Sequence, residues 1–223
     1  MHPTRTGSIR RVGMGLSMIL AWPLFAVGFA IHPAQSTSGA EQLRVIAANS
    51  GRWDLAHVLI LISLVLFIPA VLGLMGFLQR RGAWVGLIGG AFVAIGVVFF
   101  AAWVGAEGFV SSALAGLPAN RHAALAPAVH AIVVPRGALS LVETASLLLI
   151  AGWLALAIGL FAARTVPRWM SVAMGVGVLL LVGSALATPQ VGAVGAAALA
   201  VGVGGIGLQV LKGTHEVGEA IPV

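Results

Sequence analysis

Cysteine and tyrosine are absent from this 223-residue sequence, and charged residues are scarce at 8%. Without cysteine the chain has no disulfide, no thiolate-ligated zinc or iron–sulfur site and no cysteine nucleophile. A soluble domain carries roughly 25% charged residues. This chain is 60% hydrophobic with a mean hydropathy of +1.07, so it cannot cover a water-facing surface. Most of it must therefore face lipid or itself.

Familiar signatures of enzymes and of nucleic-acid-binding proteins are also missing. The sequence has no HExxH, no paired ExxH of di-iron bundles, no GxSxG and no Walker loop. The net charge is +6, but the basic residues occur singly or in pairs between apolar runs rather than as one basic face. The centres of the apolar runs carry no charge, which argues against an ion channel or a proton-driven carrier with a midplane site.

The chain is organised around the stretch from Trp53 to Trp103, where two apolar runs are joined by QRRGA. Each run is long enough to cross a hydrocarbon core of about 30 Å, so the stretch predicts a transmembrane helical hairpin. Four further apolar runs predict one all-α polytopic domain over residues 1–223, a six-transmembrane-helix bundle. The expected helices cover residues 12–31, 54–78, 84–106, 141–163, 169–187 and 191–211.

The distribution of basic residues predicts the orientation in the membrane. In the six-span arrangement eight basic residues fall on one side and four on the other. The eight are Arg5, Arg10, Arg11, Arg80, Arg81, Arg164, Arg168 and Lys212. The positive-inside rule places them in the cytoplasm, together with both termini and the tail 212–223, for a protein of the cell membrane.

Two extracytoplasmic loops follow from this orientation. Loop 32–53 is expected to hold a short surface helix over residues 41–48, and Asp54 is expected to cap the helix that follows. Loop 117–138 is expected to hold an interfacial helix interrupted near Pro127. The helix that begins at Trp84 is expected to continue outward to Leu114.

Two features leave alternatives open. Residues 12–31 also resemble a signal peptide cleaved near Ser38-Gly39-Ala40, although the apolar run exceeds the usual 7–15 residues of such a peptide. Segments 73–98 and 155–183 share an apolar run, a basic turn, a tryptophan and a glycine-rich run. This order predicts a duplicated hairpin, while convergence between apolar hairpins explains it equally.

A stripe of small residues recurs every fourth position near the end of the chain, at Gly192, Ala196, Ala200 and Gly204. Small residues allow membrane helices to approach closely. The stripe predicts either a seam for a homo-oligomer or for a partner in a larger membrane complex, or ordinary packing within the bundle.

Three ionisable residues fall within the expected spans: His57, Glu107 and Glu143. Each lies about 20–23 residues from the cytoplasmic end of its helix, or roughly 30–35 Å at 1.5 Å per residue. We therefore expect them at one level near the outer boundary of the bilayer, beneath the loop that carries His130. Ser111 follows Glu107 by one helical turn.

Imidazole with carboxylate is a combination that zinc, copper or non-haem iron uses. The sequence favours a pocket for a metal ion or a small polar or lipid ligand, lined by His57, Glu107 and Glu143, with His130 as its lid. The cofactor stays unknown: a metal ion fits better than a haem, which would use His57 and His130. Proton relay and plain polar packing explain the same residues, since Glu143 suits the start of a helix. A non-catalytic accessory subunit and a metal-dependent intramembrane enzyme are the alternative functions.

Overall fold

The computed structural model describes residues 5–78, 82–134, 140–184 and 189–213, and within these ranges the side chains of 5–6, 140–146, 184 and 189–190 are not described. In this part of the chain the fold is entirely helical, and it contains no strand. The all-α prediction is therefore confirmed. The expected tail 212–223 lies outside the described residues beyond Gly213.

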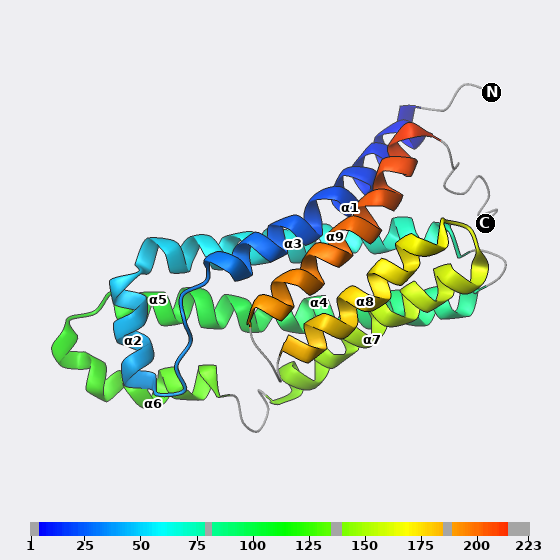
Figure 1. Cartoon of the computed structure of the whole chain (residues 1–223). Coiled ribbons are helices and arrows are strands. Elements are labelled where there is room, and N and C mark those ends of the chain that lie inside the picture. The colour runs from blue at the N-terminus through cyan, green and yellow to red at the C-terminus, as the bar shows by residue number, and fades with distance from the viewer. Residues whose placement is uncertain (1–4, 79–81, 135–139, 185–188, 214–223) are drawn as a thin grey trace.

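In the described ranges the chain forms six long helices and a group of short ones (Figure 1). The long helices are α1 (Arg5–Ile31), α3 (Ser50–Gly76), α4 (Ala83–Gly105), α7 (Ser140–Ala163), α8 (Arg168–Ser184) and α9 (Pro189–Lys212). The short ones are α2 (Gly39–Ala48), the π-helix η1 (Ala106–Val110), α5 (Ser111–Ala115), the 3-10 turn η2 (Ala119–Arg121) and α6 (His122–Val133). Helices α2, α5 and α6 gather at one end of the molecule, and we call them the cap.

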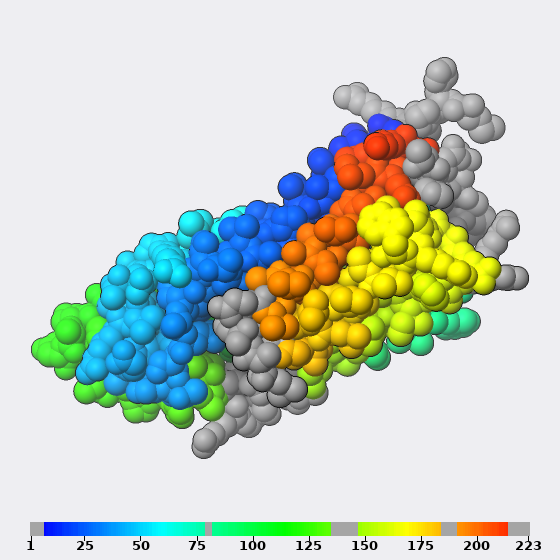
Figure 2. Space-filling view, in the orientation of Figure 1, coloured from blue at the N-terminus to red at the C-terminus, as the bar shows by residue number. Residues whose placement is uncertain are grey.

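The six long helices form a closed ring. Helix α1 packs on α3 and α9, α9 on α8, α8 on α7, α7 on α4, and α4 on α3. Figure 2 shows three of them, α1, α9 and α8, lying side by side across one face. Packing within the hairpins α3–α4 and α7–α8 is less extensive than packing between α4 and α7 or between α1 and α3. The ring therefore depends on contacts between segments far apart in the sequence.

Within the residues that the structure describes, four stretches are long and apolar enough to cross a membrane: Gly7–Ile31, Ser50–Gly76, Ala83–Ala115 and Val191–Lys212. Helices α7 and α8 offer the shorter apolar segments Leu147–Ala163 and Arg168–Gly183 within the described side chains. The chain is thus a membrane-embedded helical protein. The six-span topology and the duplicated hairpin stay predictions.

Aromatic side chains fill the middle of the ring. The ring centroid of Trp22 on α1 lies 4.7 Å from that of Phe67 on α3 and 5.2 Å from that of Trp153 on α7. All three side chains are buried, and Phe25 extends the cluster along α1. This cluster joins α1, α3 and α7 in the interior of the ring.

Glycines set the closest helix crossings. A Cβ built on Gly152 of α7 would lie 2.6 Å from the carbonyl oxygen of Gly89 on α4. A Cβ on Gly177 of α8 would lie 2.7 Å from the carbonyl oxygen of Gly195 on α9. Because real Cβ atoms do not approach so closely, only glycine permits these backbones to touch.

The stripe on α9 faces inward. Ala196 and Gly204 are buried, and Ala200 packs against the buried core. A Cβ on Gly204 would meet the Cα of Ile19 on α1 at 3.8 Å. Most of the stripe therefore packs within the bundle, as the second interpretation of the sequence predicts. The seam for a homo-oligomer or a membrane-complex partner stays a prediction.

Two expectations for the helices at the cap end of the molecule are wrong. Helix α3 begins at Ser50, so Asp54 lies inside it and the prediction that Asp54 caps the helix is wrong. The earlier start lets Trp53 enter the cap core with Leu43 and Val129. Helix α6 runs through Pro127 without interruption. Pro127 lies in the second turn, where the missing N–H removes a single intrahelical bond.

Candidate functional site

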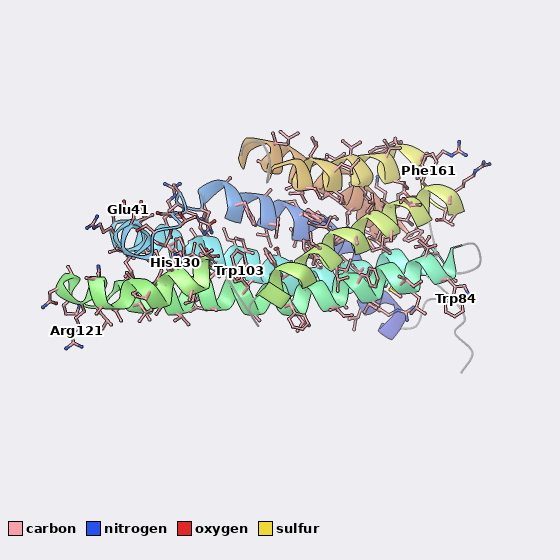
Figure 3. The ribbon with its side chains drawn as sticks, turned by 90° about the horizontal axis from the view of Figure 1, so that it is seen from below. Glu41, Trp84, Trp103, Arg121, His130 and Phe161 are labelled. Atoms are coloured by element: carbon pink, nitrogen blue, oxygen red, sulfur yellow. The ribbon has the colours of Figure 1, made fainter. Side chains whose placement is uncertain are left out.

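The site lies on a helix that is longer than the hydrocarbon core is thick. Helix α4, η1 and α5 form one rod of 33 residues, Ala83–Ala115. At 1.5 Å per residue it is about 50 Å long, whereas the hydrocarbon core is about 30 Å thick. Figure 3 shows Trp84 near one end of the molecule and Arg121 at the other. Glu107 lies roughly 35 Å along the rod from Trp84, at the junction between bundle and cap.

Glu107 lies in the π-helical turn, a local irregularity that often marks functional sites. The next residue, Gly108, offers its carbonyl oxygen to Nε1–H of Trp53 at 3.1 Å. A Cβ on Gly108 would lie 2.5 Å from Cδ2 and 2.6 Å from Cγ of His57. The glycine therefore allows the His57 ring to lie against the π turn, beside Glu107.

The carboxylate of Glu107 is almost completely buried, with 2% of the residue exposed. Its Oε1 accepts a hydrogen bond from Nε2 of Gln35 at 2.6 Å. Its Oε2 faces Nε2 of His57 at 3.9 Å, which is within ion-pair range but beyond hydrogen-bond length. Burying a charge without a full partner costs several kcal/mol. The site therefore favours an additional positive charge near Oε2.

The two histidines at the junction each leave one nitrogen available. Nδ1 of His57 lies 2.9 Å from the carbonyl oxygen of Trp53, and Nδ1 of His32 lies 2.7 Å from that of Pro33. A carbonyl can only accept, so Nδ1 carries a proton in both rings. The ring centroids lie 4.9 Å apart. Burial lowers the pKa of His32, so this ring is neutral at neutral pH with Nε2 as an acceptor.

Two further polar atoms at the junction are buried without a described partner. They are Oγ of Ser111, one turn beyond Glu107, and Nε2 of Gln42 on α2. Buried polar atoms in native proteins nearly always have a hydrogen-bond partner. These two atoms therefore mark places where a water molecule or a ligand atom fits the site.

Residues 32–38, which we call the strap, cover the Glu107 carboxylate. Gln35 is itself exposed, yet its amide reaches inward to Glu107. The strap is held by two further bonds. Oε1 of Gln42 accepts from the Ser36 N–H at 2.6 Å, and Nδ1 of His130 donates to the Thr37 carbonyl oxygen at 2.7 Å.

The structure brings two of the four predicted ligand-binding residues together, His57 and Glu107. His130 is exposed on α6 and bonds to the strap. Glu143 lies on α7, but its side chain is outside the described residues, so its part in the site stays a prediction. Among the residues that are described, no three His, Asp or Glu side chains lie close enough to hold a metal ion.

Three residues of the site were not expected from the sequence. Gln35 lies in a polar loop whose path no local pattern predicts, and Gly108 was one of 30 glycines. In the sequence Trp53 only marks the start of the apolar hairpin, yet its side chain is completely buried. Comparison of the chain with protein-family models, with curated proteins and with solved structures gave no match.

Proposed function

We propose that this membrane protein binds a small cation at Glu107 and His57, at the junction between bundle and cap. The observation that carries the proposal is the buried carboxylate of Glu107. One of its oxygens is bonded to a neutral amide, and the other lies 3.9 Å from an imidazole nitrogen. A positive charge in that space would offset the cost of burying the carboxylate.

Three groups near this space, besides the carboxylate, can accept, as a cation requires. Nε2 of His57 and Nε2 of His32 have lone pairs when the rings are neutral, and Oγ of Ser111 can accept as well. Imidazole with carboxylate suits a divalent transition metal. A small protonated amine would instead donate charged hydrogen bonds to the carboxylate. Both ligands share the positive charge that the carboxylate selects.

The strap provides a route of entry. Gln35 donates an N–H to Glu107 where a cationic ligand would place its own charge. Because Gln35 is exposed, its side chain can leave the carboxylate and rejoin water without unpacking the cap. We infer that the ligand displaces Gln35.

The proposal places the site on the extracytoplasmic side of a six-span bundle with both termini in the cytoplasm. The count of basic residues supports this orientation. The first turns of α1 and the last turns of α9 lie at the same end, since a Cβ on Gly15 would lie 2.8 Å from the side chain of Leu211. The cap lies at the opposite end (Figure 1).

Calorimetric titration of the purified protein, with ZnCl₂ and separately with methylammonium chloride, tests the proposal. We expect the wild type to bind at least one of the two probes and Glu107→Gln to bind neither. Glu41→Gln is the matched control, because Glu41 is an exposed cap carboxylate paired with Arg44 at 3.1 Å. Gln35→Ala should bind more tightly than the wild type.

The two probes distinguish the two kinds of ligand. Binding of Zn²⁺ alone assigns the site to a metal ion, and binding of methylammonium alone assigns it to an amine. Equal binding by the wild type and Glu107→Gln, or no binding of either probe by the wild type, would refute the proposal.

A further inference from the structure

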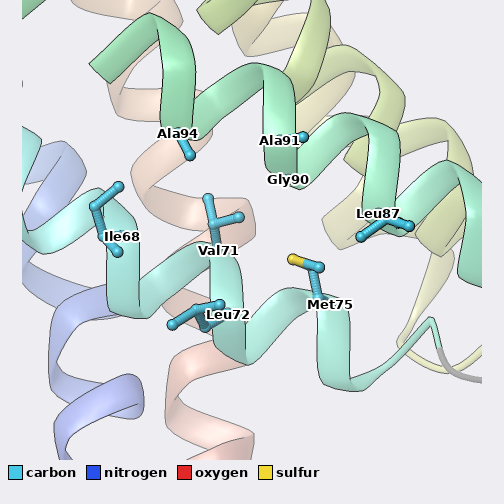
Figure 4. A pocket seen from close by; sticks show the side chains of 8 residues that line it. All are labelled: Ile68, Val71, Leu72, Met75, Leu87, Gly90, Ala91 and Ala94. Atoms are coloured by element: carbon cyan, nitrogen blue, oxygen red, sulfur yellow. The ribbon is translucent and has the colours of Figure 1, made fainter. Parts of the chain in front are cut away.

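We propose that a phospholipid acyl chain occupies a groove between α3 and α4, far from the Glu107 site. The groove has a volume of about 240 Å³ and is lined by four residues of each helix. Figure 4 shows them facing one another, with Ile68 and Ala94 at one end and Met75 and Leu87 at the other.

The groove exists because α4 is drawn toward α7. A Cβ on Gly89 would lie 3.1 Å from the carbonyl oxygen of Gly152, and one on Gly96 would lie 2.5 Å from Cβ of Leu149. These close approaches seat α4 on α7. Helix α3 packs instead on α1, and its contact with α4 is less extensive. The hairpin partners are therefore packed less extensively on each other, and side chains such as Met75, which lies against Gly90, line the space between them.

The chemistry of the lining excludes water as the occupant. All eight lining residues are apolar, whereas a bound water molecule needs two to four polar partners. Leu72 and Leu87 flank the groove and are 57% and 52% exposed, so it is continuous with the surface that faces lipid. An empty groove would forfeit the dispersion contacts that an apolar chain can make.

The groove fits within the thickness of one leaflet of the bilayer. Trp84 precedes Leu87, Ala91 and Ala94 on the same face of α4 and is 76% exposed. Tryptophan prefers the level of the lipid headgroups. From Trp84 to Ala94 the helix rises about 15 Å, half of a core of about 30 Å. An acyl chain in the groove would therefore place its headgroup beside Trp84.

A lipid chain suits the groove better than a helix of a second copy of the chain does. The groove is the space between two neighbouring helices of one hairpin, about 240 Å³ lined by eight apolar residues. A helix with its side chains is about 10–12 Å across, whereas a single acyl chain is thinner.

Native mass spectrometry of the protein, released from phosphatidylcholine nanodiscs into a mild detergent, tests the proposal. We expect a protein–phospholipid adduct for the wild type and loss of that adduct for Ala91→Phe, in which the new ring fills the groove. Ala102→Phe is the matched control, because Ala102 is equally an exposed residue of α4 but lies outside the groove. It should retain the adduct.

A second variant, Ala94→Leu, fills the other end of the groove and should also lose the adduct, which keeps the test decisive if Ala91→Phe does not fold. Equal retention of phospholipid by Ala91→Phe, Ala94→Leu and Ala102→Phe would overturn the proposal. So would the absence of any adduct on the wild type, or a wild-type dimer that Ala91→Phe abolishes, which would assign the groove to a second copy of this chain.

Discussion

Replacing Gly108 with alanine should displace His57 and destabilise the junction between bundle and cap. The new Cβ would lie 2.5–2.8 Å from Cδ2, Cγ and Cβ of His57, where ordinary contacts are 3.4–4 Å. These atoms belong to the base of a side chain that is only 1% exposed and is bonded to the Trp53 carbonyl, so they cannot swing away. Overpacking of this kind costs about 1–3 kcal/mol.

Gly105→Ala provides the reference for this change. Gly105 lies three residues earlier on the same rod, and a Cβ there would meet nothing within 4 Å. Alanine in a helix is favoured over glycine by up to about 1 kcal/mol, so Gly105→Ala should stabilise the protein slightly. We expect Gly108→Ala to be about 1–3 kcal/mol less stable than Gly105→Ala, because the propensity gain is similar in both.

Reversible unfolding in mixed micelles, followed by tryptophan fluorescence and circular dichroism, measures this difference. In the calorimetric titration Gly105→Ala should bind the cation probe, whereas Gly108→Ala should not. Only Gly108→Ala displaces the His57 imidazole that lies beside Glu107. If the two alanine variants unfold together and bind the probe equally, the close approach of His57 to the π turn does not hold the junction as argued.

Two further predictions concern the cap and the strap. Gly39→Ala should loosen the cap and speed its proteolysis, because the new Cβ would lie 2.9 Å from the carbonyl carbon of Ala126 on α6. Gly51→Ala is the control, since a Cβ there meets nothing within 4 Å, and it should leave the rate of cleavage unchanged. Burial lowers the pKa of His32, so His32 binds a proton more readily in the unfolded chain than in the folded protein. The free energy of unfolding should therefore be full above pH ~6.5 and should decline as the pH falls below that value. Between pH 7.5 and pH 5 the free energy of unfolding should decline less for His32→Gln than for the wild type. An equal decline would contradict the role of His32 in the acid sensitivity.

The apolar helices were predictable because hydropathy is a local signal with a physical cause. A backbone in lipid must satisfy its own hydrogen bonds, so a long apolar run becomes a helix whatever its neighbours do. The all-α fold follows from this rule. The Asp54 prediction failed for the opposite reason. Capping preference is worth about 1 kcal/mol, and burial of Trp53 in the cap core moved the start of the helix to Ser50.

The site was predictable only in part. Counting residues from the helix ends placed His57 and Glu107 at similar depth, and the structure brings them together. The depth of a residue in the membrane does not predict which helices face each other. The hydrogen-bond partner of Glu107 is Gln35, in a loop 72 positions away in the sequence. A contact of that kind depends on how the strap crosses the junction, and no periodic pattern encodes it.

The glycines of α4 and its extension link the two proposed sites. Gly108 brings the rod against His57 of α3 at the outer end, and Gly86 brings it against Leu78 near the inner turn. Between these points Gly89 and Gly96 turn the helix toward α7 instead. Between these ends α4 still meets α3 at Gly90, where a Cβ would be in contact with Sδ of Met75. The polar junction forms at the outer end of the hairpin, and the lipid-facing groove forms between the side chains that line its middle.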